Sequence, residues 1–210
     1  MPPTETENPE SNQLRCPWPG INDPIYTRYH DEEWGVPKTD SIALFEKLIL
    51  EGFQSGLSWL TILKKRDNFR AAFHGFAPKR IARYTDKDVA RLMNDAGIVR
   101  NRLKINATID NAKAMLALST HTSLSDFLWG FIDGRPIINR AKAFKDVPSQ
   151  TELSKTISKA LKKEGFRFIG PTTVYAFMQS TGMVNDHLIS CPQHAACAKL
   201  QRTLPKTHNV

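Results

Sequence analysis

The chain has 210 residues, of which 40% are hydrophobic and 24% are charged, and its formal net charge is +8. This composition excludes collagen-like, wholly disordered and membrane-embedded proteins. No apolar run approaches the ~20 residues needed to cross a bilayer, and the start, MPPTETENPE, lacks the features of a secretory signal, so we expect a cytoplasmic protein with no membrane partner.

Start and stop signals for helices recur along the chain without convincing strand alternation, which predicts an all-α fold. Residues 1–14 are polar and acidic and are predicted to be disordered, whereas 16–37 and 133–148 are predicted to be connecting loops. The predicted helices run from Asp40 to Gly52, from Ser58 to Phe73, from a Thr85–Asp88 capping box to Gly97, over 102–118, from Ser123 to Trp129, from Ser149 with Glu152 to Gly165, and onward from Pro171.

The charge is distributed unevenly along the chain. Residues 1–60 carry four Lys or Arg against ten Asp or Glu, a net of −6, whereas residues 61–210 carry 25 against 11, a net of +14. A basic surface is typical of proteins that bind a polyanion, although many solvated surfaces are merely rich in lysine. We therefore expect the two stretches to have different tasks.

Cysteine and histidine residues cluster near both ends of the chain. Cys16 and His30 lie near the start, and His187 and Cys191 lie near the end at i and i+4, a spacing that would put both on one face of a helix. Two thiolates and two imidazoles make a closed tetrahedral zinc site, which is structural rather than catalytic. Spacing alone also allows a chance arrangement, or a C-terminal site made of His187, Cys191, His194 and Cys197.

The stretch LKKEGFRFIGPTTVYAFMQ predicts two helices joined by a glycine-containing turn. Backbone amides at the start of the second helix can bind a phosphate, and Gly170, Thr172 and Thr173 are the candidate residues. A helix-hairpin-helix element grips a DNA backbone in this way without reading sequence. The alternative is a helical hairpin that only packs.

Aromatic residues gather in the acidic first part of the chain, and their flat faces on a loop suit stacking with a base, although aromatic residues more often belong to a core. They are Trp18, Tyr26, Tyr29, Trp34 and Trp59. Glu51 borders the apolar face of its predicted helix at ~20° from Leu44 on a helical wheel, which predicts burial. A buried carboxylate either bonds nearby amides, here those of residues 55–59, or is kept for function.

A glycine-rich turn follows Glu51. The sequence GFQSGLSW places Gly56 and Leu57 between two predicted helices. A mobile tip with an exposed leucine can fill the space that an everted nucleotide leaves in DNA.

Five motifs together resemble one known family. YHDEEWGVP (29–37), LEGFQSGLSW (50–59), DAGIVRNRLKI (95–105), ALKKEGFRFIGPTTVYAFMQ (160–179) and GMVNDHLISC (182–191) are similar to the 3-methyladenine DNA glycosylase I family of bacteria. The resemblance runs from about Arg15 to Cys191. It implies a helix-hairpin-helix glycosylase domain of two helical lobes over 15–195, with the hairpin at about 160–180 and a C-terminal tail at 196–210.

The resemblance also implies roles for particular residues. The zinc ligands would be Cys16, His30, His187 and Cys191, and Glu51 with Tyr29 would bond the extruded base. Trp59 would stack on the base, with Trp18, Trp34 and Tyr26 as further walls, and Gly56 with Leu57 would enter the DNA. The implied activity is hydrolytic excision of 3-methyladenine from alkylated double-stranded DNA by a monomer.

The N3-methylated adenine is cationic, so an aromatic cage with one carboxylate suits it. With Pro171 and Thr172 after Gly170, no lysine is placed there for a Schiff base, and we predict an abasic product without strand cleavage. Asp186 could serve as a helix cap. Two alternatives remain, a non-enzymatic zinc-stabilised DNA-binding protein and a zinc-dependent hydrolase or nuclease, and the second conflicts with a four-ligand metal site.

Overall fold

The computed structural model describes residues 14–204, so the tail predicted to be disordered lies outside the described residues apart from Leu14. Within this range the chain is mostly helical, as predicted. The helices are α1 (Pro24–Glu32), α2 (Ser41–Gln54), α3 (Trp59–Ala72), α4 (Pro78–Ile81), α5 (Asp86–Asn94), α6 (Arg102–Leu118), α7 (Leu124–Gly130), α8 (Glu152–Lys163), α9 (Pro171–Ser180) and α10 (Pro192–Arg202), with short 3-10 turns at η2 (His74–Phe76) and η3 (Phe144–Asp146).

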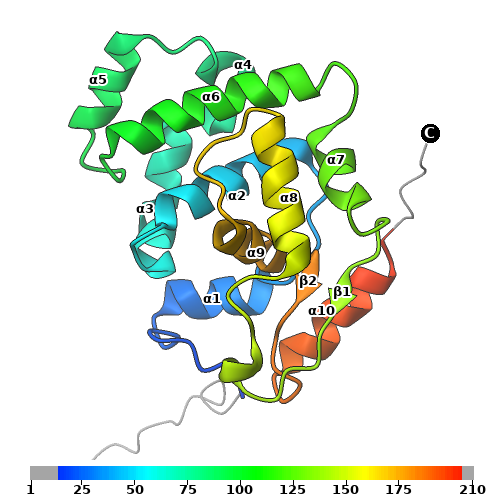
Figure 1. Cartoon of the computed structure of the whole chain (residues 1–210). Coiled ribbons are helices and arrows are strands. Elements are labelled where there is room, and N and C mark those ends of the chain that lie inside the picture. The colour runs from blue at the N-terminus through cyan, green and yellow to red at the C-terminus, as the bar shows by residue number, and fades with distance from the viewer. Residues whose placement is uncertain (1–13, 205–210) are drawn as a thin grey trace, which may run out of the picture.

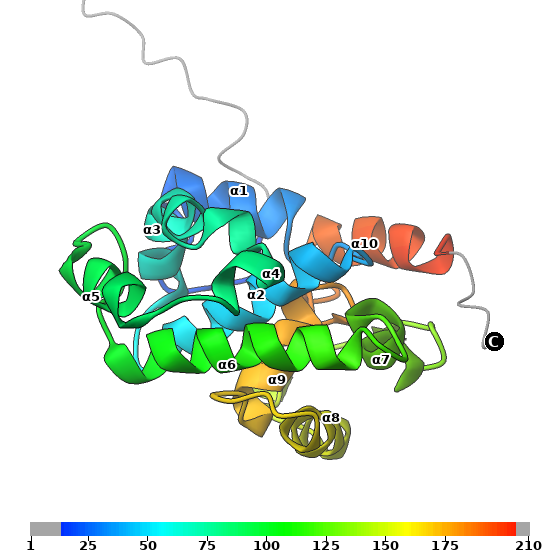
Figure 2. The same ribbon diagram turned by 90° about the horizontal axis from the view of Figure 1, so that it is seen from above.

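The helices surround a central pair, α2 and α9, which pack against each other. Viewed from above, α1 and α10 lie on one side of α2 and α8 lies on the other, with α9 extending from α2 to α8 and α6 crossing over α9 (Figures 1 and 2). The helices α8 and α9 form the predicted hairpin and pack against each other at a steep angle, since each is seen end-on in the view where the other lies in the plane (Figures 1 and 2). Because α1 and α10 come from opposite ends of the chain, the fold brings the two termini of the described range to the same side.

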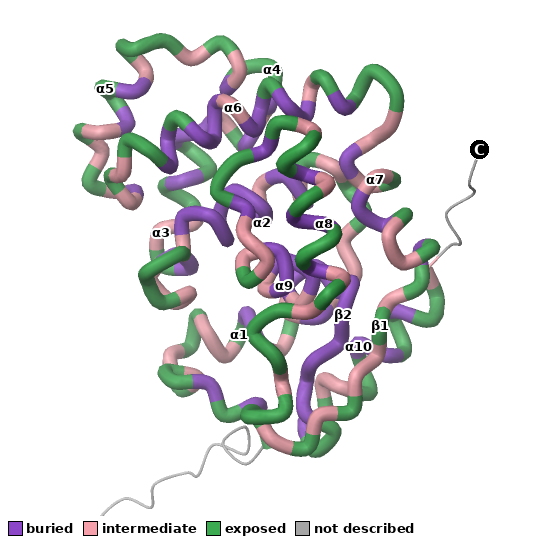
Figure 3. The backbone as a smooth tube through the Cα atoms, viewed as in Figure 1, coloured by how far each residue is buried: buried purple, intermediate pink, exposed green. Residues whose placement is uncertain are grey.

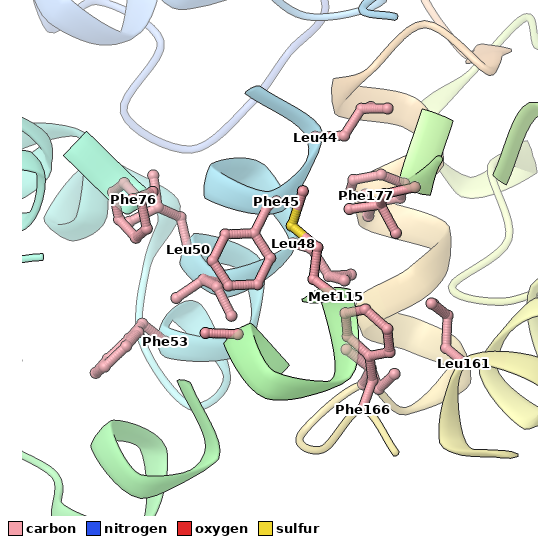
Figure 4. Packing of buried hydrophobic residues seen from close by; sticks show 14 of the residues in the cluster. Leu44, Phe45, Leu48, Leu50, Phe53, Phe76, Met115, Leu161, Phe166 and Phe177 are labelled. Atoms are coloured by element: carbon pink, nitrogen blue, oxygen red, sulfur yellow. The ribbon is translucent and has the colours of Figure 1, made fainter. Parts of the chain in front are cut away.

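The hydrophobic core lies around α2, whose buried stretch is visible at the centre of Figure 3. Phe45, Leu48 and Leu50 of α2 lie among Met115 of α6 and Phe177 of α9 (Figure 4). Burial of one such large apolar side chain contributes roughly 1.5–3 kcal/mol to stability. This core holds α2 rigidly, and α2 carries Glu51.

Several predicted caps are confirmed. The Asp40 carboxylate accepts from the Ala43 amide at 2.8 Å, and the Ser58 hydroxyl accepts from the Thr61 amide at 3.2 Å, so α2 and α3 begin where the sequence indicates. The bounds of α6 are those predicted, Ser123 caps α7, and Pro171 occupies the first turn of α9. Gly165, with φ of 92°, follows the end of α8 as expected.

Three predicted helix boundaries are wrong, and the first is the end of α2, which continues past Gly52 to Gln54. Thr151, not Ser149, caps α8, because the Thr151 hydroxyl accepts from the Ser154 amide at 3.1 Å while the Ser154 hydroxyl accepts from the Thr151 amide at 2.9 Å. Gly97 does not end α5 in a left-handed conformation. That helix already stops at Asn94, and the Asp95 carboxylate binds the Gly97 amide at 2.7 Å instead.

Two regions are more ordered than the sequence indicated. The loop 133–148 contains β1 (Ile137–Ile138), which pairs in parallel with β2 (Val184–Asn185) and thereby joins the loop to the segment after α9. Residues 196–202 of the expected C-terminal tail form the second half of α10, where Cys197, Ala198 and Gln201 are buried, and residues 205–210 lie outside the described residues. None of the helices within residues 14–204 is long and apolar enough to cross a membrane.

Candidate active site

The aromatic segment near the N-terminus is only partly a loop, contrary to the prediction. Residues 24–32 form α1 because Asp23 and Pro24 are a strong start signal: the Asp23 carboxylate accepts from the Ile25 amide at 3.0 Å, and Pro24 has no amide to leave unpaired. The buried residues of this helix are Tyr29 and His30, which are consecutive in the sequence. One residue therefore faces a cavity and the next a metal-binding cluster, both described below.

A cavity of about 370 Å³ lies beside α1, within the range of roughly 300–1,000 Å³ that is usual for ligand sites. Its lining includes all five predicted base-binding aromatic residues and the predicted catalytic carboxylate. They are Trp18, Tyr26, Tyr29, Trp34, Trp59 and Glu51. The tertiary structure thus brings together residues from the N-terminal segment, α1, α2 and α3.

The aromatic rings form a continuous wall. The ring centres of Trp18 and Tyr26 are 5.2 Å apart, and those of Tyr29 and Trp59 are 5.6 Å apart. Trp18 also meets Trp34 edge to face at 4.7 Å. Electron-rich faces arranged in this way attract a flat ligand, and they attract a cationic one most strongly.

Glu51 is buried, as the helical wheel predicted, with only 4% of its surface exposed. Burial raises the pKa of Glu51 to about 7, against the opposing effects of the Lys47 charge and the Ser180 hydroxyl. The alternative that Glu51 bonds the amides of residues 55–59 is wrong, since no such hydrogen bond joins these described residues. Its carboxylate is therefore available to a ligand in the cavity.

Sequence reasoning did not place three polar residues in the cavity. Gln54, Gln179 and Asp186 also line the cavity, together with Phe144 and residues 147–149. Asp186 is not a helix cap, because its carboxylate accepts from the Tyr175 hydroxyl and the Gln179 amide, each at 2.7 Å. Gln54 lies three residues after Glu51 on the same helix, a spacing that could have indicated it.

The four predicted metal ligands form one buried cluster, with their ligand atoms all within 4.8 Å of one another. The Sγ atom of Cys191 lies 3.7 Å from both His30 Nε2 and His187 Nδ1, and Cys16 Sγ lies 3.6 Å from His187 Nδ1. Tetrahedral zinc with bonds of about 2.3 Å to sulfur and about 2.0 Å to nitrogen requires such separations of about 3.5 Å. The donor set and its spacing therefore fit a divalent metal ion.

The outer nitrogen of each histidine has a partner that orients the ring. His30 Nδ1 lies 2.7 Å from the Asp31 carboxylate, and His187 Nε2 lies 2.9 Å from the Trp34 carbonyl. These bonds leave His30 Nε2 and His187 Nδ1 as the ligand atoms, an arrangement typical of metal-bound histidine.

The hydrogen bond between the two cysteines of the cluster moves their pKa values in opposite directions. A hydrogen bond from Cys16, with others from both histidines, lowers the pKa of Cys191, and the same bond raises the pKa of Cys16. A divalent cation bound here would stabilise both thiolates.

The purely C-terminal arrangement is not formed. Cys197 Sγ lies 3.6 Å from the Trp34 carbonyl, and His194 Nε2 bonds the Asn139 carbonyl at 2.8 Å. The expected helical spacing of His187 and Cys191 is also wrong, because these residues lie in a turn and Cys191 immediately precedes α10. The turn places both ligand atoms toward the cluster.

The cluster supports the aromatic wall directly. The His187 ring meets Trp34 edge to face at 4.5 Å, and the His30 ring meets Trp18 at 4.8 Å. The N-terminal segment has few aliphatic partners, so a metal at this point would hold the cavity wall in place.

The predicted DNA-binding tip lies between α2 and α3. Gly56 has φ of 85°, which a residue with a side chain rarely adopts, and Leu57 is 40% exposed. Lys104 of α6 holds the start of this turn, since its Nζ donates to the carbonyls of Phe53 at 2.9 Å and Ser55 at 2.7 Å.

The hairpin turn lies next to this tip. Asn111 of α6 binds both backbone groups of Arg167, and a Cβ at Gly52 would lie 3.4 Å from the Phe168 carbonyl. At the start of α9, Gly170 faces open space, Thr172 is exposed and Thr173 is partly exposed. The amides at this helix start are therefore accessible to an anion.

Comparisons with known proteins agree with this site. A family model for methyladenine glycosylases matches residues 18–194. The DNA-3-methyladenine glycosylase of Haemophilus influenzae is 54% identical over 179 residues, which are 85% of this chain and 96% of the relative.

Solved structures give the same result. A crystal structure of 3-methyladenine DNA glycosylase I has a TM-score of 0.83 at 52% identity and covers 85% of this chain and 98% of its own. A tyrosine-to-phenylalanine variant of such an enzyme, solved in complex with 3-methyladenine, has a TM-score of 0.80 at 39% identity and covers 83% and 95%. The residues that the family model matches include the aromatic wall, Glu51 and three of the four metal ligands, and the chain belongs to the methyladenine glycosylase family.

Proposed function

We propose that this protein is a DNA repair glycosylase that excises 3-methyladenine from alkylated double-stranded DNA. The observation that carries the proposal is the buried Glu51 carboxylate in a cavity walled by aromatic rings. Family membership supports it, as does the related structure in complex with 3-methyladenine.

The reaction breaks the bond between the sugar C1′ and the base N9. Methylation at N3 makes the bound base cationic, so the bonding electron pair leaves with the base and produces neutral 3-methyladenine. The sugar C1′ is then electron-deficient and takes up water, and one proton of that water is released to solvent. The products are the free base and an abasic site.

The cavity contributes recognition and orientation. Ionised Glu51 accepts a hydrogen bond from the exocyclic amine of the base and attracts its positive charge. Trp59 stacks on the base, and the other rings of the wall favour a cation over neutral adenine through cation–π attraction. A weakened glycosidic bond needs little further catalytic assistance, and we assign Asp186 no catalytic role.

Two neighbouring surfaces bind the DNA. Leu57 at the tip fills the space of the everted nucleotide, with Gly56 allowing the turn, and the α9 amides near Gly170, Thr172 and Thr173 bind a backbone phosphate. Because no lysine stands at the start of α9, the enzyme leaves the abasic site uncut. Borohydride trapping is expected to yield no protein–DNA adduct, and a trapped adduct would contradict this part of the proposal.

The metal of the cluster is zinc in a structural role. Cys16, His30, His187 and Cys191 would occupy all four positions and leave none for water, so the ion contributes folding free energy rather than chemistry. Elemental analysis is expected to give one zinc per chain, and Cys16→Ala is expected to lose zinc and unfold at lower temperature. Substoichiometric metal together with unchanged Cys16→Ala stability would refute the assignment.

The direct test of function is chromatography of the bases released when the purified protein meets methylated DNA. The proposal predicts 3-methyladenine in the soluble fraction. A non-enzymatic DNA-binding protein would bind the DNA and release nothing, which would refute the glycosylase assignment. Backbone cleavage that needs a metal, and that is lost on chelation while the fold persists, would instead indicate a nuclease.

A further inference from the structure

A buried ammonium group lies directly behind the wall of the cavity. Lys47 of α2 is only 5% exposed and does not line the cavity itself. Its Nζ lies 4.5 Å from the centre of the Tyr29 ring and 4.6 Å from that of Trp59, and both of these rings do line the cavity. Lys47 therefore contacts the wall from outside the cavity.

The hydrogen bond between Lys47 and Tyr29 has a fixed direction. Lys47 Nζ donates to the Tyr29 hydroxyl oxygen at 3.1 Å. An ammonium group has three donors and no acceptor, so the tyrosine oxygen must accept and its own proton must point elsewhere. Within residues 14–204 that proton has no hydrogen-bond acceptor, and the residue lines the cavity.

The surroundings keep Lys47 charged near neutral pH. Burial lowers the pKa of Lys47 to about 8, while the charges of Glu51 and Glu33 oppose this effect and those of Lys38 and Arg66 add to it. Lys47 and Glu51 lie one helical turn apart, but their charged atoms form no ion pair within 4.0 Å among the described residues. The direct partner of the ammonium is thus Tyr29.

We propose that Lys47 is a positioning residue that directs the Tyr29 hydroxyl proton into the cavity, toward an acceptor nitrogen of the bound base. The inference rests on the proposed function. Tyr29 and ionised Glu51 then present one donor and one acceptor to the base. Adenine carries an acceptor, N7, beside a donor, the N6 amine, whereas guanine carries two acceptors there. The arrangement selects adenine.

The test is a double-mutant cycle with Lys47→Met and Tyr29→Phe. The readouts are the single-turnover release of 3-methyladenine from methylated DNA and the affinity for free 3-methyladenine. Lys47→Met is expected to reduce both about tenfold in the native background and less than twofold in the Tyr29→Phe background. Equal losses in the two backgrounds would refute the proposal.

A second cycle distinguishes positioning from a pure charge effect on the carboxylate. Affinity for free 3-methyladenine is compared for Glu51→Gln with and without Lys47→Met at pH 6, well below the pKa of about 8 at which Lys47 releases its proton. The expected result is the same tenfold loss as in the native background, because Tyr29 remains misdirected. If Lys47→Met has no effect once Glu51 is neutral, Lys47 acts through the carboxylate and the proposal is wrong.

Lys104→Met is a matched control, because Lys104 is also buried but donates only to backbone carbonyls. Its effect on base affinity is expected to be equal in the native and Tyr29→Phe backgrounds. Lys47→Arg, which keeps a donor and a charge, is expected to recover part of the affinity that Lys47→Met loses. If the native protein releases no 3-methyladenine, the proposed function fails. If it releases the base but Lys47→Met has the same effect in the native and Tyr29→Phe backgrounds, only the proposed role of Lys47 is overturned.

Discussion

Replacing Glu51 with glutamine is expected to stabilise the folded protein and, at the same pH, to slow its release of 3-methyladenine. Glutamine keeps the shape of the side chain but cannot ionise. Burial raises the pKa of Glu51 from 4.5 to about 7 in the folded protein. Since one pKa unit corresponds to about 1.36 kcal/mol, the ionised carboxylate costs roughly 3 kcal/mol of folding free energy above pH 7.

The sign of the pH dependence follows from the raised pKa. Below pH 4.5 the carboxyl group is protonated in both the folded and the unfolded chain and costs nothing, and stability is then lost as the pH rises through about 7. The advantage of Glu51→Gln is therefore expected to be roughly 2 kcal/mol larger at pH 8 than at pH 5. Lys47 loses its compensating charge in the variant, but its own pKa is already lowered to about 8, so at pH 8 it can release its proton at little cost.

The assay is urea unfolding of both proteins at pH 5 and pH 8, compared as a difference so that histidine titration cancels. Glu152→Gln is the control, because the Glu152 side chain is 89% exposed and its replacement is expected to change stability by less than about 0.5 kcal/mol. If the stability gain of Glu51→Gln over the native protein is no larger at pH 8 than at pH 5, the reasoning is refuted and Glu51 is a structural carboxylate.

Activity is expected to move in the opposite direction. A hydrogen bond to a charged group contributes roughly 1.5–3 kcal/mol, so Glu51→Gln is expected to release 3-methyladenine about 10 to 100 times more slowly. Affinity for undamaged DNA is expected to change little, because phosphate contacts dominate it. In the native protein kcat/KM is expected to fall below pH 7 as Glu51 becomes protonated, and this fall is expected to be absent from the variant.

Three further changes test other parts of the structure. Leu57→Ala removes an exposed side chain, so it is expected to change stability by less than about 0.5 kcal/mol. It is also expected to slow base release from double-stranded DNA, and unchanged release would show that Leu57 does not fill the space of the everted nucleotide. Lys104→Met loses two bonds to carbonyls at the end of α2 and is expected to lower the unfolding free energy by roughly 2–3 kcal/mol in urea, whereas an unchanged value would show that the tip needs no such support. Gly182→Ala is expected to reduce the Tm sharply, because Gly182 has φ of 70° and a Cβ there would lie 2.5 Å from the Pro37 nitrogen, and a native Tm would contradict this close approach.

The sequence alone determined the parts of this protein that depend on local signals. Caps such as Asp40 and Ser58 begin helices through bonds to amides three residues away, so they are visible in the sequence. The burial of Glu51 followed from its angle on one helix. The same wheel places Lys47 about 40° from Glu51, so the buried lysine could also have been found.

Only the tertiary structure decided which distant residues meet. Spacing left the choice between two metal-ligand sets open, because Cys16 and His187 are 171 residues apart in the chain and no local signal joins them. The bonds that Asp186 accepts from α9 were hidden for the same reason. The direction of the Tyr29 hydroxyl likewise depends on packing α1 against α2, which brings Lys47 to within 3.1 Å of it. Contacts between separate elements are set by the packing of the whole core, and that packing gives the cavity its chemistry.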